Sequence, residues 1–194
     1  MTEREWIRAS LEAASSLFME TASSCGAAIE EAGRTAVDCL TKGGKLLLCG
    51  NGGSAADAQH IAAEMSVKMR RVRSPMAAVA LTTNSSLLTA QANDLGFETV
   101  FSRQIESLGS QGDVLIAIST SGNSANILVG AETARRLGIK VIGLTGCGGG
   151  KLARMCDIPI VVPSSDVPRI QEIHIAIGHL ICDYAEARLF GENV

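Results

Sequence analysis

Two short segments of this sequence carry side chains suited to acid–base chemistry or to metal binding. His60 and Glu64 stand four residues apart, and Gln171 and His179 stand eight residues apart near the end of the chain. If both segments are helical, each pair lies on one face of its helix. A carboxylate and an imidazole can then act as general base and acid, or as ligands of zinc. Glutamine is an uncommon zinc ligand, and Gln171 lies roughly 12 Å from His179 along a straight helix, so the spacing leaves both hypotheses open.

Loops rich in glycine and hydroxyl groups follow three of the apolar runs in the sequence. Gly50–Ser54 and Ser119–Ser124 each open a segment expected to be helical, and Thr145–Gly150 follows a later run. Backbone N–H groups at a helix start, with the positive end of the helix dipole, bind anions. Capping alone explains one such loop, since serine is a preferred N-cap. Four hydroxyls within Ser119–Ser124 exceed what capping requires, and we infer a phosphate monoester as the ligand.

Neither common nucleotide motif is complete. Gly50–Ala55 fits the GxGxxG/A pattern, but that pattern also needs an acidic residue at the end of the second strand. Thr82–Asn84 stand there, and the next acid is Asp94. A P-loop needs Ser or Thr directly after its lysine, whereas Lys151 is followed by Leu152. We therefore expect no nucleotide cofactor.

The composition of the 194 residues, 46% hydrophobic and 19% charged, is that of a globular protein. Seventeen Lys and Arg against 20 Asp and Glu give a net charge of −3, which provides no basic field for nucleic acid or anionic lipid. The sequence contains no run of 18 apolar residues, so it predicts no membrane span. The first ten residues do not have the pattern that begins a signal peptide. Six scattered cysteines without a CxxC pair favour reduced thiols and a cytoplasmic location.

Five short apolar runs, each ending in small polar residues, predict buried strands. Continuous rather than alternating apolar character is typical of parallel strands covered on both faces. Helical segments separate the runs, which predicts a doubly wound, flavodoxin-like α/β fold with a five-stranded parallel sheet. The predicted strands are Leu46–Cys49, Ala77–Leu81, Val114–Ile118, Val141–Leu144 and Ile158–Val162. The predicted helices are Ser54–Lys68, Glu98–Leu108, Ser124–Leu137 and a last one from about Pro168 to Leu189.

Apolar spacings of three and four predict a helical extension over residues 1–43, ahead of an α/β core at 44–194. Ser23, Ser24 and Gly26 are expected to divide this extension into two helices, the second ending near Lys42. Its apolar stripe must be buried, and we expect part of it to pack against a second subunit. Residues 1–194 are expected to form one domain, because no linker rich in Pro or Ser divides them. The stripe consists of Ile7, Leu11, Ala14, Phe18, Ala22, Cys25 and Ile29.

Several blocks of the sequence, in order and without gaps, match one family over nearly the whole chain. The blocks are Cys49–His60, Glu64, Asn93–Asp94, Ser119–Ser124 and Arg169–His174. Together they resemble sugar isomerase (SIS) domains, and specifically the bacterial sedoheptulose 7-phosphate isomerases, or phosphoheptose isomerases. The resemblance implies conversion of D-sedoheptulose 7-phosphate to D-glycero-D-manno-heptose 7-phosphate through an enediol, the first step towards nucleotide-activated heptose for surface polysaccharide such as lipopolysaccharide. It also implies a homotetramer with active sites at subunit interfaces.

The resemblance assigns roles to individual residues. Glu64 and His179 correspond to the acid–base pair, Glu64 moving a proton between C1 and C2 and His179 acting on the sugar oxygens. Some members bind zinc, one ion per subunit, through positions that match His60, Glu64, Gln171 and His179. The substrate contacts correspond to Asn51, Gly52, Gly53, Ser54, Glu64, Asn93, Asp94, Ser119, Thr120, Ser121, Ser124 and Gln171.

Two positions depart from the family pattern. Lys68 stands where members often carry arginine, so an ammonium replaces a bidentate fork and any substrate contact there is in doubt. Pro168 stands where some members carry aspartate, and proline suits the first turn of a helix.

Two other functions are alternatives to the isomerase. A non-catalytic SIS protein would bind a replication-initiation partner, but relatives of that kind lack the acid–base pair that Glu64 and His179 supply here. A sugar-phosphate sensor would need a separate DNA-binding domain, for which the chain has neither a basic patch nor spare length.

Overall fold

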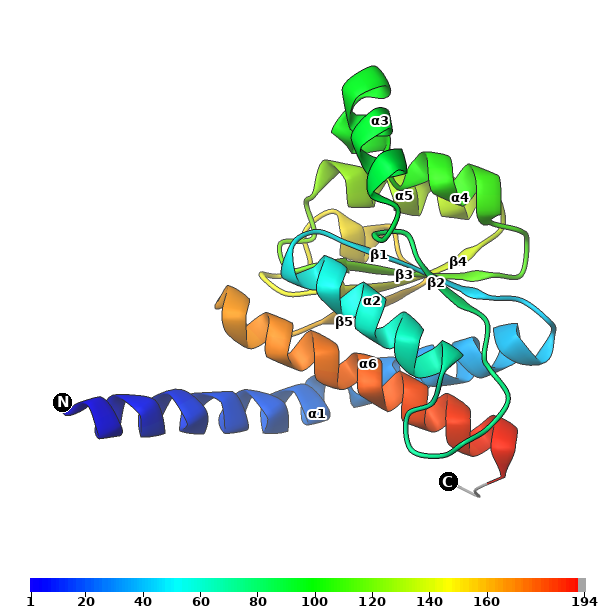
Figure 1. Ribbon diagram of the computed structural model, residues 1–194. Helices are drawn as coiled ribbons and strands as arrows, with labels where there is room; N and C mark the ends of the chain where they lie inside the picture. The colour runs from blue at the N-terminus through cyan, green and yellow to red at the C-terminus, as the bar shows by residue number, and fades with distance from the viewer. Residues whose placement is uncertain (192–194) are drawn as a thin grey trace.

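Five parallel strands form the centre of the structure, a computed structural model that describes residues 1–191 (Figure 1). The sheet order is β2-β1-β3-β4-β5, and every neighbouring pair is parallel. This confirms the predicted doubly wound fold. Residues 192–194, which the single-domain prediction included, lie outside the described residues. The strands are β1 (Leu46–Gly50), β2 (Ala78–Ala80), β3 (Val114–Ser119), β4 (Lys140–Thr145) and β5 (Ile158–Val161).

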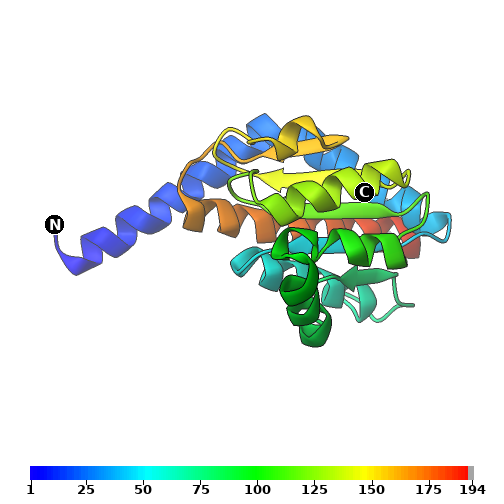
Figure 2. The ribbon, with the colours of Figure 1, turned by 90° about the horizontal axis from the view of Figure 1, so that it is seen from above.

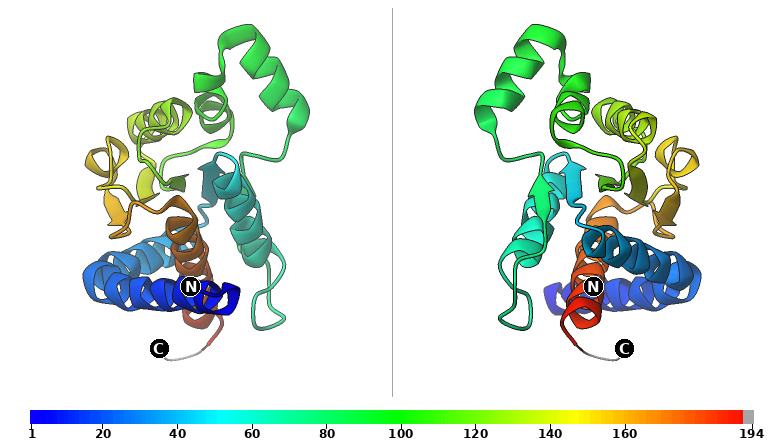
Figure 3. Two further views of the ribbon diagram at one scale, coloured as in Figure 1. Left: turned by 90° about the vertical axis from the view of Figure 1, so that its left-hand side faces the viewer. Right: turned by 90° about the vertical axis from the view of Figure 1, so that its right-hand side faces the viewer.

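Helices cover both faces of the sheet (Figures 1 and 3). One layer holds α1 (Glu3–Thr41), α2 (Gly53–Ser66) and α6 (Val167–Phe190). The other layer holds α3 (Ser85–Leu95), α4 (Ser102–Leu108) and α5 (Ala125–Arg136), with the short 3-10 helices η1 (Phe97–Thr99) and η2 (Leu152–Arg154). Among residues 1–191, no helix is both long enough and apolar enough to cross a membrane.

Each face of the sheet builds its own core because successive side chains of a strand point to opposite faces. On β1, Leu46 and Leu48 join the core beneath α1, α2 and α6, whereas Leu47 and Cys49 join the core beneath α4 and α5. All five residues of β1 are buried, which explains why its sequence is continuously apolar.

The predicted break in the amino-terminal extension is wrong, because α1 continues without interruption from Glu3 to Thr41. The Ser23 and Ser24 hydroxyls donate back to the carbonyls of Met19 and Glu20, at 3.1 and 2.9 Å, and so remain compatible with a helix. Gly26 costs such a helix about 1 kcal/mol. Packing of the carboxyl-terminal half of α1 against α6 and β5 offsets that cost.

The amino-terminal half of α1 projects beyond the sheet (Figures 1 and 2). Ile7, Leu11 and Phe18 from the predicted stripe are exposed there, together with Trp6 and Met19. The described part of the chain therefore leaves half of the stripe uncovered.

The segment between β2 and β3 differs from the single predicted helix at Glu98–Leu108. It forms α3, η1 and α4 in succession, and α3 is absent from the prediction. Asn84 begins α3 as its N-cap, since its Oδ1 accepts the N–H of Leu87 at 3.0 Å. Helix α3 contains no buried residue and packs chiefly against η1, so it stands away from the body (Figure 3).

His174, on α6, is a structural residue. Its side chain is fully buried, and Nε2 lies 3.1 Å from the carbonyl oxygen of Thr145 at the end of β4. Nε2 must carry the proton, because only a donor can pair with a carbonyl. Burial lowers the pKa of His174 to about 4, although the hydrogen bond to Thr145 opposes that shift. The neutral imidazole thus ties α6 to the sheet.

This burial predicts an acid-sensitive contribution to stability. His174 binds a proton more weakly in the folded chain than in the unfolded chain, so stability is fully present above pH 6.5 and falls as the pH drops towards 4. Between pH 7 and pH 5 the loss from this group is about 2 kcal/mol. In His174→Gln the amide nitrogen can replace Nε2, and urea unfolding at the two pH values should lack this component. An unchanged pH dependence in the variant would contradict the assignment.

Candidate active site

The loops that follow β1 and β3 meet where the strand order reverses, the place where open α/β sheets bind ligands. Asn51 in the first loop and Asn126 in the first turn of α5 join them through reciprocal amide hydrogen bonds of 2.9 and 2.8 Å. Asn126 is only 3% exposed and was not among the predicted site residues. Its position just after the serine-rich loop was the available signal. The pair holds the two loops at a defined separation.

The serine-rich loop has the geometry of an anion site. The Ser119 and Ser124 hydroxyl oxygens lie 3.2 Å apart, and the Ser121 hydroxyl accepts the backbone N–H of Asn123 at 3.2 Å. Ser124 occupies the N-cap of α5 but makes no capping hydrogen bond. Capping therefore does not account for this hydroxyl, and the positive end of the α5 dipole faces the loop.

The glycine-rich loop after β4 supports the serine-rich loop. Gly146 donates its N–H to the carbonyl of Thr120 at 2.9 Å, and Leu152 donates to the carbonyl of Gly122 at 2.9 Å. Gly122 has a φ of +63°, and a Cβ there would stand 2.7 Å from the carbonyl carbon of Gly149. The two loops pack backbone against backbone, which only glycine permits.

His60, Glu64 and His179 come together where α2 packs against α6. The Nε2 atoms of His60 and His179 are 2.9 Å apart, and His60 Nε2 lies 3.6 Å from Glu64 Oε1. The two rings meet edge to face, with centroids 5.1 Å apart. The helical spacing of four predicted the His60–Glu64 pair, and the tertiary structure adds His179 from a helix more than a hundred residues away.

Asp57 belongs to the same cluster, although it was not among the predicted site residues. Burial raises the pKa of this carboxyl, and the nearby His60 and His179 oppose that shift. Its Oδ2 is buried and has no hydrogen-bond partner within the described chain. Its position three residues before His60, on the same helical face, was the available signal.

The close approach of α2 and α6 depends on Gly178, next to His179. A Cβ at position 178 would stand 2.7 Å from Cγ1 of Ile61, which is fully buried beside His60. The absence of a side chain at Gly178 therefore lets the two helices bring their histidines into contact.

Gln171 occupies the opposite end of the site from His179. A Cβ on Gly53 would lie 2.7 Å from Nε2 of Gln171, so this amide rests against the glycine loop after β1. No hydrogen bond joins Gln171 to the histidine–glutamate cluster within the described chain. Helix α6 thus presents one polar side chain to the loop and another to the cluster.

Asn93 and Asp94, two of the predicted substrate contacts, lie on α3, away from the loops and the histidine cluster. Both are exposed near the end of α3, where the Asn93 amide donates to Asp94 Oδ1 at 2.8 Å. The structure does not bring them to the loops or to the cluster of the same chain. Lys68 is also exposed, just beyond the end of α2.

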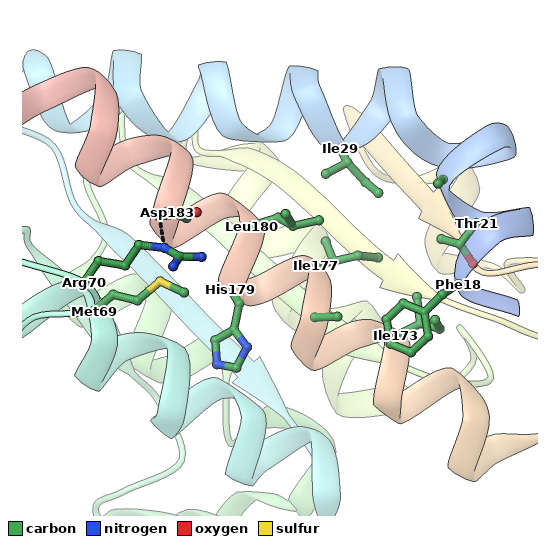
Figure 4. A pocket seen from close by; sticks show the side chains of 12 residues that line it. Phe18, Thr21, Ile29, Met69, Arg70, Ile173, Ile177, His179, Leu180 and Asp183 are labelled. Carbon is green, nitrogen blue, oxygen red and sulfur yellow. Dashed lines mark hydrogen bonds and ion pairs between the residues drawn. The ribbon is translucent and has the colours of Figure 1, made fainter. Parts of the chain in front are cut away.

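A largely apolar groove of about 370 Å³ runs between α1 and α6 and reaches His179 (Figure 4). Phe18, Ile29 and Ile177 line it, and an ion pair of 2.6 Å between Arg70 and Asp183 stands at one end. The groove continues the uncovered stripe of α1 towards the cluster.

Within residues 1–191, no group of three or more His, Cys, Asp or Glu side chains is arranged to hold a metal ion. The two imidazoles at 2.9 Å are at hydrogen-bond distance, with one nitrogen donating and the other accepting.

Comparison with known proteins gives a consistent result. Residues 10–146 match the model of the SIS domain family. The phosphoheptose isomerase of Rhodospirillum rubrum is 52% identical over 94% of this chain and 97% of that protein. The structure of phosphoheptose isomerase GmhA from Neisseria gonorrhoeae superposes with a TM-score of 0.91 at 44% identity, over 96% of this chain and all of that one. A phosphoheptose isomerase from Francisella tularensis gives 0.91 at 40% identity, over 95% and 98%.

The helix crossing at Gly178 yields a stability prediction. Gly178→Ala should cost about 1–3 kcal/mol in urea unfolding, because its methyl group meets buried Ile61. Ile61→Val removes a methyl group from that side chain, and the double variant should recover part of the loss. Additive losses in the two variants would show that the crossing does not depend on this contact.

Proposed function

This chain belongs to the phosphoheptose isomerase family of SIS domain proteins, and we propose that it converts D-sedoheptulose 7-phosphate to D-glycero-D-manno-heptose 7-phosphate in heptose biosynthesis. The observation that carries the proposal is the meeting of His60, Glu64 and His179 between α2 and α6, in a fold whose serine-rich loop suits a phosphate. The relatives described above are named as isomerases and give no support to a replication partner.

Glu64 carries the proton in the proposed mechanism. An aldose–ketose isomerisation moves one proton between C1 and C2 of the open sugar, and a single carboxylate can remove it from one carbon and return it to the other. Glu64 is half-buried, on the inner face of α2, and its Oε1 faces His60.

His179 acts on the sugar oxygens. An imidazole that donates to the developing enediolate oxygen stabilises it and can also assist ring opening. Its contact with His60 orients the ring, and Asp57 lies near both histidines.

The phosphate is held by Ser119, Thr120, Ser121 and Ser124 at the start of α5. The uncapped helix end and the neighbouring hydroxyls favour a dianion. Gly52, Gly53, Ser54 and Gln171 are proposed to contact the sugar, with Asn51 held by Asn126. Anchoring the phosphate positions C1 and C2 of a flexible seven-carbon chain beside Glu64.

One zinc ion per subunit is proposed at His60, Glu64 and His179. Two imidazole nitrogens and a carboxylate oxygen are a donor set that zinc favours. These three side chains would hold the ion after reorienting, since among residues 1–191 they are not arranged around a metal position. When bound, the ion supplies a Lewis acid for the sugar oxygens. A role for Gln171 as fourth ligand stays a prediction.

We further propose a homotetramer with active sites at subunit interfaces. The groove between α1 and α6 and the exposed stripe at Ile7, Leu11 and Phe18 offer an apolar surface for another subunit. Asn93 and Asp94 stand on the protruding α3, from which they would serve the crevice of a neighbouring subunit. The six cysteines, all free, favour a cytoplasmic location.

Glu64→Gln tests the assigned base. Turnover of sedoheptulose 7-phosphate should fall by about 10³-fold or more, because the amide cannot accept the proton. Binding of the sugar phosphate, measured by calorimetry, should remain because the serine-rich loop is unchanged. The exposed Glu132→Gln on α5 is the matched control and should keep wild-type turnover. Lost binding with turnover remaining would contradict the assignment.

Metal removal tests the zinc proposal separately. Chelation should abolish isomerisation, and added zinc should restore it. Elemental analysis should find one zinc per subunit in the wild type and a reduced content in His60→Ala. Full turnover in a demonstrably zinc-free sample would rule out the metal while leaving the isomerase proposal intact.

A further inference from the structure

A buried carboxylate holds the loop that leads from α2 towards β2. Glu186 on α6 is 1% exposed and accepts the backbone N–H groups of Met69, Arg70 and Arg71 at 3.3, 3.1 and 3.0 Å. Burial raises the pKa of this carboxyl, but these bonds and one from Arg73 outweigh burial and lower it overall. Glu186 therefore remains ionised and fastens the loop to α6.

Arg73, in the same loop, joins Glu186 to the end of α2. Its side chain is 2% exposed, and its Nε donates to Glu186 Oε2 at 3.0 Å. The two terminal nitrogens donate to the carbonyls of Met65 and Glu64, at 2.7 and 2.8 Å. The last carbonyls of a helix have no partner within it, so the guanidinium caps the carboxyl-terminal turn of α2.

One of the two α2 carbonyls that Arg73 holds belongs to Glu64, the base of the proposed reaction. The other end of the link, Glu186, lies seven residues beyond His179 on α6, about two helical turns away. Arg73 thus connects the backbone of the base to the helix that carries the acid.

We infer that Arg73, fastened by Glu186, is a positioning residue that sets the carboxylate of Glu64 against the contacting pair of His60 and His179. The inference rests on the proposed isomerase function and concerns turnover, not capture of the substrate. The glycine loop opens α2 and the serine-rich loop opens α5, and the hydrogen bonds of Arg73 at the last turn of α2 involve neither loop.

The inference depends on the planar guanidinium of Arg73, which carries several N–H donors. Its three nitrogens donate at once to a carboxylate, to two carbonyls of α2 and to the carbonyl of Ser74, whereas an ammonium is a single point of charge on a flexible stem. The neighbouring ion pair of Arg70 with Asp183 also links the loop to α6, but it is largely exposed and makes no contact with the end of α2 among the described residues. Exposed pairs of that kind contribute little.

Arg73→Lys is the decisive variant. Its kcat should fall about 10–100-fold, since a misplacement near 1 Å can cost two orders of magnitude. Its KM for sedoheptulose 7-phosphate should stay within about twofold, because the phosphate loops are unchanged. Arg136→Lys, an exposed arginine on α5, is the matched control. Ile139→Ala, a buried position on the opposite face of the sheet, controls for lost stability.

All variants are compared at a temperature where circular dichroism shows each one folded. If Arg73→Lys does not fold, Glu186→Gln takes its place, because its amide oxygen can still accept the loop N–H groups. Guanidinium ion added to Arg73→Gly should recover part of kcat and leave KM unchanged.

Three results would overturn the inference. The first is a kcat for Arg73→Lys equal to that of Arg136→Lys, and the second is a loss of kcat equal to that of Ile139→Ala. The third is a rise in the KM of Arg73→Lys at unchanged kcat. In each of these cases active wild type and inactive Glu64→Gln would keep the proposed function. Absence of turnover in the wild type would instead remove the proposed function, and this inference with it.

Discussion

The contact between α2 and α6 is the constraint on which the rest of the site depends. Gly178 allows the approach, since any side chain there would meet the buried Ile61. The residues beside this contact, His60 and His179, consequently reach hydrogen-bond distance. Interiors are packed too densely for one helix to shift freely past another. A steric requirement in the core thus sets the distance between two polar groups at its edge.

A second constraint is electrostatic and acts at the carboxyl ends of the strands. The sheet delivers two loops to the point where its strand order reverses, and the amide pair of Asn51 and Asn126 keeps them together. Ser124 begins α5 without capping it, which leaves the helix end available to an anion. The close backbone contact between Gly122 and Gly149 packs the serine-rich loop against the glycine-rich loop after β4.

Helix α6 connects these two constraints. From its amino end to its carboxyl end it places Gln171 against the glycine loop, His174 against the sheet, His179 in the cluster and Glu186 under the loop after α2. A hydrogen-bonded helix of 24 residues holds such groups at nearly constant separations. Helix α6 therefore fixes the glycine loop, the sheet, the histidine cluster and the loop after α2 relative to one another.

The sequence by itself determined the strands, the parallel sheet, the loops at the strand ends and the pairing of His60 with Glu64, because each depends on local spacing and apolar pattern. The predicted break in α1 was wrong, because packing of the carboxyl-terminal half of this helix offsets the cost of Gly26. The sequence pattern did not predict α3, whose N-cap is Asn84. Only the tertiary structure decided that Asn126 meets Asn51, that Asp57 joins the cluster and that Arg73 bridges Glu64 and Glu186. Each of these contacts joins side chains whose meeting depends on how whole helices pack, and no periodicity in the sequence encodes that choice.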